Sequence, residues 1–219
     1  MEDTQKASLA TTLDRFDIAL PVEQIEQLDR YCRLLWSWNE RLNLTRHTDY
    51  EKFVTRDVVD SLALADHLDE AARVLDVGIG GGVPGVILAI VRPDLKLTAC
   101  ESVQKKFQAV HAIAGELALP IEIVHARAEE VLESRRYDTL VARAVAPLAK
   151  LLYWLEPYWD AIGQLIIIKG RHWVDERHAA REQGRLGKLE LRRVATYNTP
   201  GTDRESVILR IWRDEEPIT

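Results

Sequence analysis

The sequence predicts an α/β fold in which a mostly parallel sheet of seven strands carries helices on both faces and ends in an antiparallel hairpin. Two observations support this fold. From Arg73 to Gly170, short apolar stretches typical of strands alternate with helical stretches, which is the pattern of a parallel sheet. The last two strand-like stretches are joined only by "PGTDRE", which leaves no room for a crossover helix. We therefore expect a helical N-terminal extension, residues 1–70, and a sheet domain, residues 71–219.

The extension is expected to be helical because its apolar residues recur at helical spacing and because no glycine precedes Gly78. One helix is predicted over 21–44, where Pro21 occupies a favoured position in the first turn. A second helix is predicted over 50–68 after a short link.

The sheet domain is predicted from seven apolar stretches with strand character. These lie at 73–78, 96–102, 121–126, 137–145, 163–170, 189–199 and 206–213. Helices are expected over 83–91 and 103–119, between the first three strands. Open α/β sheets bind ligands beyond the carboxyl ends of their strands, so the loops at these ends are the places to look for function.

Composition limits the possible classes of protein. The chain has 219 residues, of which 47% are apolar, and a formal net charge of −6. No apolar run reaches the ~18 residues of a membrane span, and the polar N-terminus does not resemble a signal peptide. Cys32 and Cys100 cannot form a disulfide framework, and the histidines lack metal-ligand spacing. We expect a cytoplasmic protein with no membrane segment and no metal.

The net negative charge argues against nucleic-acid binding by the overall field, so any such binding requires a local cationic surface. Residues 169–193 carry an excess of cations over anions. This excess fits a solvated helix face with mixed ion pairs and an RNA-binding surface equally well.

The loop after the first strand, "DVGIGGGVPG", holds five glycines in eight positions. It does not match the dinucleotide pattern G-x-G-x-x-G from Gly78, because Val83 stands in the place of the third glycine, and it lacks the Gly-Lys-Ser/Thr of a phosphate loop. It does match an acid followed by alternating glycines, at Asp76, Gly78, Gly80 and Gly82. This pattern resembles the first motif of class I S-adenosylmethionine-dependent methyltransferases, whose acid lies near the amino-acid end of the cofactor.

Glu101 ends the second predicted strand, 25 residues after Asp76. A carboxylate at this place can accept hydrogen bonds from both ribose hydroxyls of a nucleoside cofactor. Together with the hairpin at the C-terminal edge, Glu101 favours S-adenosylmethionine over a nicotinamide cofactor.

Further motifs resemble one family, ribosomal RNA small subunit methyltransferase G, also called glucose-inhibited division protein B. They are "WNERLNLT" (38–45), "RDVVDSL" (56–62), "DVGIGGGVPGVILAIVRP" (76–93), "ESVQKKFQAV" (101–110), "ARAEE" (126–130), "ARAVAPL" (142–148) and "IIKG" (167–170). The resemblance implies methylation of N7 of a guanine in the decoding-centre region of 16S ribosomal RNA, either free or in the small ribosomal subunit.

The resemblance also implies roles for individual residues. Gly78 and Val83 would line the cofactor, Ala128 and Glu129 would take its adenine end, and Arg143 would lie at the cofactor and substrate pocket as the catalytic candidate. Pairing of Arg143 with Asp138 or Glu129 as a structural contact stays open. The candidate substrate-binding residues are Asn43, Arg56, Asp60, Lys169 and Arg171.

Two of these candidates have structural alternatives. Asp60 also fits local pairing, and Asn43 also fits the end of a helix. Reversing the charges of Lys169 and Arg171 together is expected to weaken RNA methylation and to spare cofactor affinity.

The sequence departs from the family pattern at three places. Asp57 follows Arg56 where the family often has histidine, Ala142 replaces a serine beside Arg143, and Glu205 replaces a basic residue near the C-terminus. These changes leave the cofactor motifs intact and put the RNA contacts in question.

The sequence shows no candidate cysteine nucleophile, which agrees with guanine N7 as the methyl acceptor. Guanine N7 already has a free lone pair, so its methylation needs neither a cysteine nucleophile nor a base, and both cysteines fall in predicted core positions. We expect a monomer. The alternatives are a small-molecule methyltransferase with the N-terminal helices as a lid, a non-catalytic cofactor-binding module and, least favoured, a nicotinamide oxidoreductase.

Overall fold

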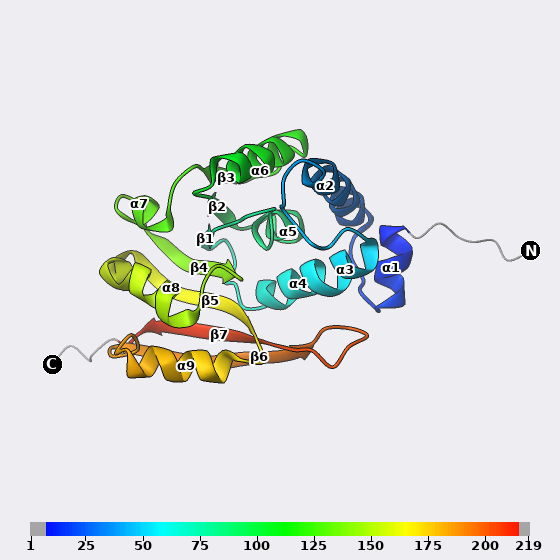
Figure 1. Cartoon of the computed structure of the whole chain (residues 1–219). Helices are drawn as coiled ribbons and strands as arrows, with labels where there is room; N and C mark the ends of the chain where they lie inside the picture. The colour runs from blue at the N-terminus through cyan, green and yellow to red at the C-terminus, as the bar shows by residue number, and fades with distance from the viewer. Residues whose placement is uncertain (1–7, 215–219) are drawn as a thin grey trace, which may run out of the picture.

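The computed structural model describes residues 8–214 and contains one sheet with the strand order β3-β2-β1-β4-β5-β7-β6 (Figure 1). The strands are β1 (Arg73–Val77), β2 (Lys96–Cys100), β3 (Ile121–Val124), β4 (Tyr137–Arg143), β5 (Ile162–Gly170), β6 (Leu189–Asn198) and β7 (Glu205–Arg213). The first five strands pair in parallel, and β7 runs antiparallel to both β5 and β6. The predicted sheet and its hairpin are confirmed.

Helices cover both faces of this sheet, as predicted. They are α1 (Leu9–Arg15), α2 (Val22–Asn39), α3 (Tyr50–Lys52), the π-helical turn η1 (Phe53–Val58), α4 (Val59–Ala65), α5 (Gly85–Val91), α6 (Gln104–Glu116), α7 (Ala128–Leu132), α8 (Leu148–Leu155), the 3₁₀ turn η2 (Glu156–Ala161) and α9 (Trp173–Glu182). Successive residues of a strand point to opposite faces. Ile167 of β5 accordingly packs in one core with α7, α8 and α9, while Ile166 packs in another with α4 and α5.

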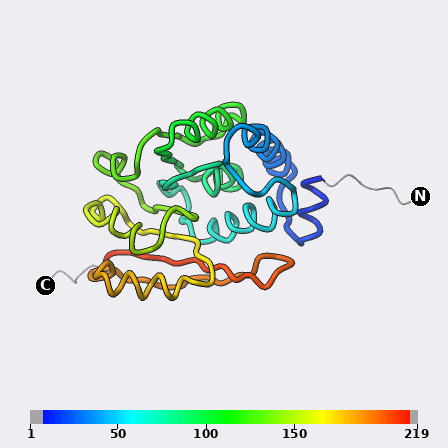
Figure 2. The backbone as a smooth tube through the Cα atoms, viewed as in Figure 1, coloured from blue at the N-terminus to red at the C-terminus, as the bar shows by residue number. Residues whose placement is uncertain are grey.

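The N-terminal helix α2 packs on α5 and α6. Its apolar face, with Leu28, Cys32 and Leu35, is fully buried in a third core. Figure 2 shows this N-terminal segment, in blue, beside the helices that follow β1 and β2. The division of the chain at residues 70 and 71 stays a prediction.

The structure differs from the predicted helices in the segment that joins α2 to the sheet. The helix predicted over 21–44 ends at Asn39, because Asn39 Oδ1 accepts hydrogen bonds from the backbone N–H groups of Leu44 (2.8 Å) and Thr45 (3.0 Å) and turns the chain back. Asn43 therefore does not end the helix. The helix predicted over 50–68 is divided into α3, η1 and α4.

Candidate active site

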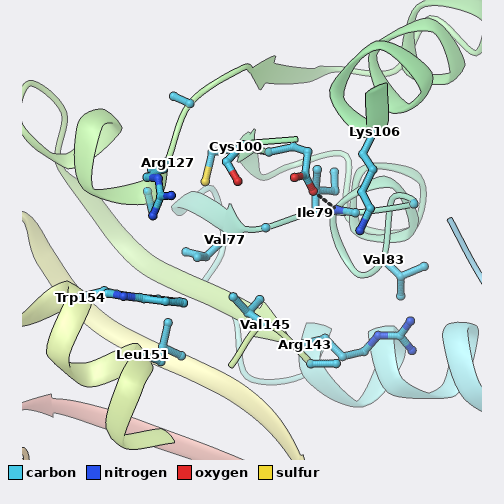
Figure 3. Close-up of a pocket in the computed structure, with 18 of the residues that line it drawn as sticks. Val77, Ile79, Val83, Cys100, Lys106, Arg127, Arg143, Val145, Leu151 and Trp154 are labelled. Atoms are coloured by element: carbon cyan, nitrogen blue, oxygen red, sulfur yellow. Dashed lines mark hydrogen bonds between the residues drawn. The ribbon is translucent and has the colours of Figure 1, made fainter. Parts of the chain in front are cut away.

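A pocket of about 410 Å³ opens at the carboxyl ends of β1, β2 and β4, where the sheet predicts a ligand site (Figure 3). Its apolar walls are formed by Val77, Ile79, Val145, Leu151 and Trp154. This volume lies in the range of roughly 300–1,000 Å³ that is usual for small-molecule sites. Apolar side chains beside polar groups such as Glu101 and Arg143 suit a flat aromatic ring with a polar tail.

The first part of the glycine loop borders this pocket. Gly78 and Gly80 have φ angles of +70° and +59°, and both line the pocket. A Cβ built on Gly80 would meet nothing closer than the carbonyl oxygen of Gly78 at 3.8 Å. A side chain at this position would therefore occupy space in the pocket, and its absence lets a ligand lie against the backbone.

The later part of the loop needs glycine for a different reason, which corrects the expectation for Gly82. A Cβ on Gly82 would lie 2.6 Å from Tyr31 Oη and 2.9 Å from Val86 Cγ2, and Gly82 does not line the pocket. A Cβ on Gly85 would lie 2.6 Å from Asp76 Oδ2. These two glycines allow the loop to pack against α2 and β1.

Asp76 was expected at the cofactor, but the structure places it behind the loop. Its side chain is buried, does not line the pocket and accepts a hydrogen bond from the backbone N–H of Gly85 at 2.8 Å. Burial raises the pKa of Asp76 to about 7, although the Gly85 hydrogen bond and Arg143 act in the opposite direction. Asp76 thus holds the start of α5 against the end of β1.

Glu101 lies where the sequence predicts a ribose ligand, at the end of β2. Its carboxylate accepts hydrogen bonds from the backbone N–H groups of Gly80 (3.0 Å) and Val103 (2.8 Å), and it lines the pocket. A carboxylate has about four acceptor sites, so this side chain keeps capacity for two hydroxyl groups.

The remaining residues predicted for the cofactor, Val83, Ala128 and Glu129, also line the pocket. Two further cations line the pocket, Lys106 from the motif at 101–110 and Arg127 from the motif at 126–130, although the sequence analysis assigns neither of them to the cofactor (Figure 3).

Arg143, at the end of β4, has neither of the structural partners considered from the sequence. It donates to Asp57 Oδ1 (2.7 Å), to Asp60 Oδ2 (3.0 Å) and to the backbone carbonyl of Arg56 (3.3 Å). Burial opposes the charge of Arg143, but the two carboxylates outweigh it and raise the pKa of the guanidinium. Arg143 is therefore held rigidly as a cation at the edge of the pocket.

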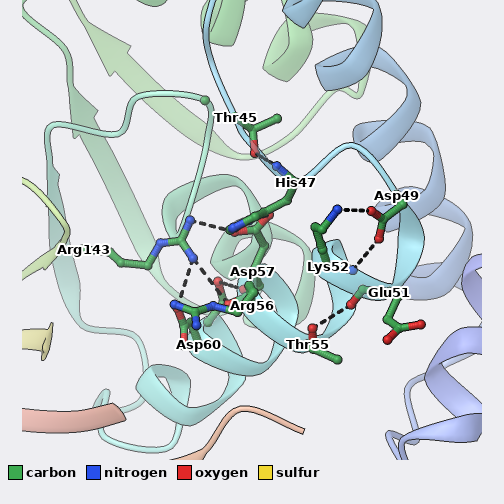
Figure 4. Close-up of polar contacts among 12 residues, drawn as sticks. Thr45, His47, Asp49, Glu51, Lys52, Thr55, Arg56, Asp57, Asp60 and Arg143 are labelled. Atoms are coloured by element: carbon green, nitrogen blue, oxygen red, sulfur yellow. Dashed lines mark hydrogen bonds and ion pairs between the residues drawn. The ribbon is translucent and has the colours of Figure 1, made fainter. Parts of the chain in front are cut away.

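Asp57 also binds His47, whose Nδ1 lies 2.9 Å from each carboxylate oxygen of Asp57 (Figure 4). The departure from the family pattern at residue 57 thus creates a buried acid that joins an imidazole to Arg143. The π-helical turn η1 presents Asp57, and α4, which continues it, presents Asp60 to the same guanidinium. His47 could not be found from the sequence, because it lies in an irregular loop without a motif.

The predicted substrate-binding residues divide into two groups. Arg56, Asp60 and Lys169 line a second cavity next to the first, whereas Asn43 and Arg171 are exposed and line neither. Lys169 is not a free cation, because it binds Glu176 (2.7 Å) and the carbonyl of Ala146 (2.7 Å). Lys169 and Arg171 therefore lie in different surroundings, and their joint role in RNA binding stays a prediction.

Two features are absent from the part of the chain that the structure describes. Within residues 8–214, no three His, Cys, Asp or Glu side chains gather in a way that could hold a metal ion. Over the same residues, no helix is both long and apolar enough to cross a membrane.

Comparison with known proteins places these observations in one family. The family model of rRNA small subunit methyltransferase G matches residues 24–207. The ribosomal RNA small subunit methyltransferase G of Rhodopirellula baltica is 45% identical over 191 residues, which cover 87% of this chain and 83% of that relative. The protein of the same name from Anaeromyxobacter sp. is 35% identical over 216 residues, covering 97% and 99%. Among solved structures, a methyltransferase from Pyrococcus furiosus shares the fold, with a TM-score of 0.57, 15% identity and coverage of 83% and 95%.

Proposed function

The chain belongs to the ribosomal RNA small subunit methyltransferase G family, and we propose that it transfers the methyl group of S-adenosylmethionine to N7 of a guanine in 16S ribosomal RNA. The main support for the site of this reaction is that two neighbouring cavities meet at one wall. The pocket bordered by the glycine loop and a second, cation-lined cavity share the wall Arg143–Ala144–Val145. A methyl donor and a nucleotide acceptor in these two spaces would meet at that wall.

The residues present fit the cofactor. Glu101 would accept hydrogen bonds from its ribose hydroxyls, and the open backbone at Gly78 and Gly80 would lie against it. The apolar side chains of Val77, Val145 and Leu151 would cover its less polar parts. When bound, S-adenosylmethionine supplies an electrophilic methyl group on a sulfonium sulfur.

The acceptor requires little chemistry from the protein. Guanine N7 offers a lone pair, so the task of the site is to hold donor and acceptor in line. A cysteine nucleophile is not needed, and the structure offers no reactive one: burial raises the pKa of the Cys100 thiol to about 12. The fixed cation of Arg143 would contact the acceptor nucleotide and orient it toward the methyl group.

We further propose that the protein acts as a monomer in the cytoplasm, on free 16S ribosomal RNA or on the small ribosomal subunit. In support of the monomer, the large apolar side chains exposed among the described residues come from four separate segments, at Val22, Val103, Tyr153 and Val174. Single exposed apolar side chains are normal on the surface of a monomer and do not require a covering partner.

The test is calorimetric titration with S-adenosylmethionine and, separately, with NAD, followed by transfer of labelled methyl groups to 16S ribosomal RNA and chemical mapping of N7-methylguanosine.

Gly80→Val should weaken cofactor binding at least ~10-fold, because its side chain would enter the pocket. The matched control is Gly201→Val, which also has a positive φ (+73°) but has open space around it, and it should bind normally. Binding of S-adenosylmethionine without transfer to RNA would overturn the proposal.

A further inference from the structure

The second cavity has a volume of about 560 Å³ and lies beside the pocket proposed for the cofactor. Its polar walls are supplied by several different parts of the chain. They include His47, Arg56, Asp60, Lys169, Glu176 and Ser206. Because this cavity and the first pocket have Arg143, Ala144 and Val145 in common, a ligand in the cavity would be a direct neighbour of the methyl donor.

The wall between the two cavities is held in a strained conformation. Ala144 has a φ of +55°, in the left-handed region that residues with a side chain rarely adopt. Such a conformation is unfavourable and persists only where surrounding contacts impose it, most often at functional sites. Arg143, fixed by two carboxylates, supplies such a contact on one side of Ala144.

The permanent cations that line this cavity are not equally neutralised. Arg143 has Asp57 and Asp60 as partners, and Lys169 has Glu176. Arg56, by contrast, has no carboxylate oxygen within 4.0 Å among residues 8–214. Asp60, one of the two acids that line the cavity, already accepts hydrogen bonds from Arg143 and from the hydroxyl of Tyr197.

The donors of Arg56 are also poorly used within the protein. Its Nε is buried without a hydrogen-bond partner, and its Nη1 has only a long contact of 3.3 Å to Thr199 Oγ1. A partly buried guanidinium in this state is unfavourable, since a charge removed from water requires a partner. Its planar set of donors matches two oxygens of a phosphate.

Other donors face the same space. The Nδ1 of His47 is used by Asp57, and its Nε2 has no partner within the described residues. Ser206 of β7 also lines the cavity. Figure 4 shows Arg56, Asp60 and Arg143 gathered together, with His47 on the other side of Asp57.

We propose that this cavity binds a backbone phosphate of the RNA at the target nucleotide, with the guanidinium of Arg56 as the principal ligand. This inference rests on the proposed function, because it takes the acceptor to be RNA. The phosphate would supply the anion that Arg56 lacks within the chain, and it would fix the nucleotide whose base lies at the wall formed by Arg143, Ala144 and Val145.

The first experiment compares Arg56→Gln with the wild-type protein in methylation of 16S ribosomal RNA. Loss of a charged contact to phosphate should raise the KM for RNA about 10-fold or more, while kcat and the Kd for S-adenosylmethionine stay within about twofold. The dependence of log KM on log salt concentration should also become shallower by about 0.7. The matched control is Arg30→Gln, which removes the same charge from an exposed position on α2 that lines neither cavity, and it should change none of these values.

The decisive experiment uses RNA assembled from synthetic pieces, in which single phosphates around the target guanine are replaced by neutral methylphosphonates. At one position the replacement should raise the wild-type KM as much as Arg56→Gln does, and it should have no further effect on the variant. Arg56→Lys keeps the charge but lacks the planar set of donors, so its KM for RNA should lie between those of the wild-type protein and Arg56→Gln. This intermediate value would show that the effect of Arg56→Gln is not caused by unfolding.

The outcomes separate this inference from the proposed function. If the wild-type protein methylates ribosomal RNA but Arg56→Gln leaves the KM and its salt dependence unchanged, the phosphate site is wrong and the function stands. The site is equally wrong if the effects of Arg56→Gln and of every methylphosphonate simply multiply. If the wild-type protein binds S-adenosylmethionine and methylates no RNA, the proposed function itself fails.

Discussion

At the scale of single residues, Asp76 shows how a functional motif can have a structural use. Its carboxyl group is buried, one of its oxygens binds the N–H of Gly85, and the other has no partner within the described residues. Burial raises its pKa to about 7. A carboxyl group with a pKa higher in the folded than in the unfolded state favours folding at low pH, and this contribution is lost as the pH rises through about 7.

Asp76→Asn keeps an acceptor for Gly85 and removes the titration. The wild-type free energy of unfolding should therefore fall relative to that of the variant between pH 4 and pH 7, by on the order of 2–4 kcal/mol. Urea unfolding of both proteins across this range measures the difference. Asp138→Asn is the contrasting control: its backbone hydrogen bond from Arg73 lowers the pKa of Asp138 below its usual value, so the wild-type advantage there is lost only below about pH 4 and should stay nearly constant across this range. A constant difference between wild type and Asp76→Asn would contradict the assignment.

At the scale of elements, the glycine loop is a corner that β1, α2 and α5 build together. Gly82→Ala places a methyl group 2.6 Å from Tyr31 Oη at a φ of +116°, and we expect it to lower the free energy of unfolding by about 2 kcal/mol or more. Gly115→Ala provides the matched control, because Gly115 lies in α6 with nothing near its Cβ and should become more stable by about 0.5–1 kcal/mol. Thermal and denaturant unfolding of both variants measure these changes. Equal effects would mean that the loop tolerates a side chain at residue 82.

The order and type of the elements were predictable because the strands are apolar runs and their helices are periodic. The positions of Glu101 and Arg143 at strand ends followed from the same pattern. The network around Arg143 was not predictable, because His47, Asp57 and Asp60 come from a loop, a π-helical turn and a helix whose relative rotation depends on packing. The ion pair between Lys169 and Glu176 was not predictable either, because it depends on how β5 and α9 pack against each other.

At the scale of the whole molecule, the formal charge of −6 favours selective over general RNA binding. Many of its arginines are engaged with acids or aromatic rings: Arg185 binds Glu156, and both Arg177 and Arg193 lie over the ring of Trp173. We expect that a tenfold excess of unrelated RNA raises the KM for 16S ribosomal RNA by less than about twofold at physiological salt. Competition assays at two salt concentrations measure this value, and strong inhibition that fades as the salt concentration is raised would instead indicate a broad basic surface.

The pocket at the sheet also has a wall that the sheet does not supply. Leu35 comes from α2, and Leu44 and Thr45 come from the loop that follows it, so three residues from the N-terminal segment line the space proposed for the cofactor. A ligand that touches both the N-terminal segment and the sheet binds only when the two are docked. Part of its binding free energy therefore stabilises their association. The occupancy of the pocket and the attachment of the first helices are thus thermodynamically linked, and the N-terminal segment would be part of the binding site as well as an extension of the fold.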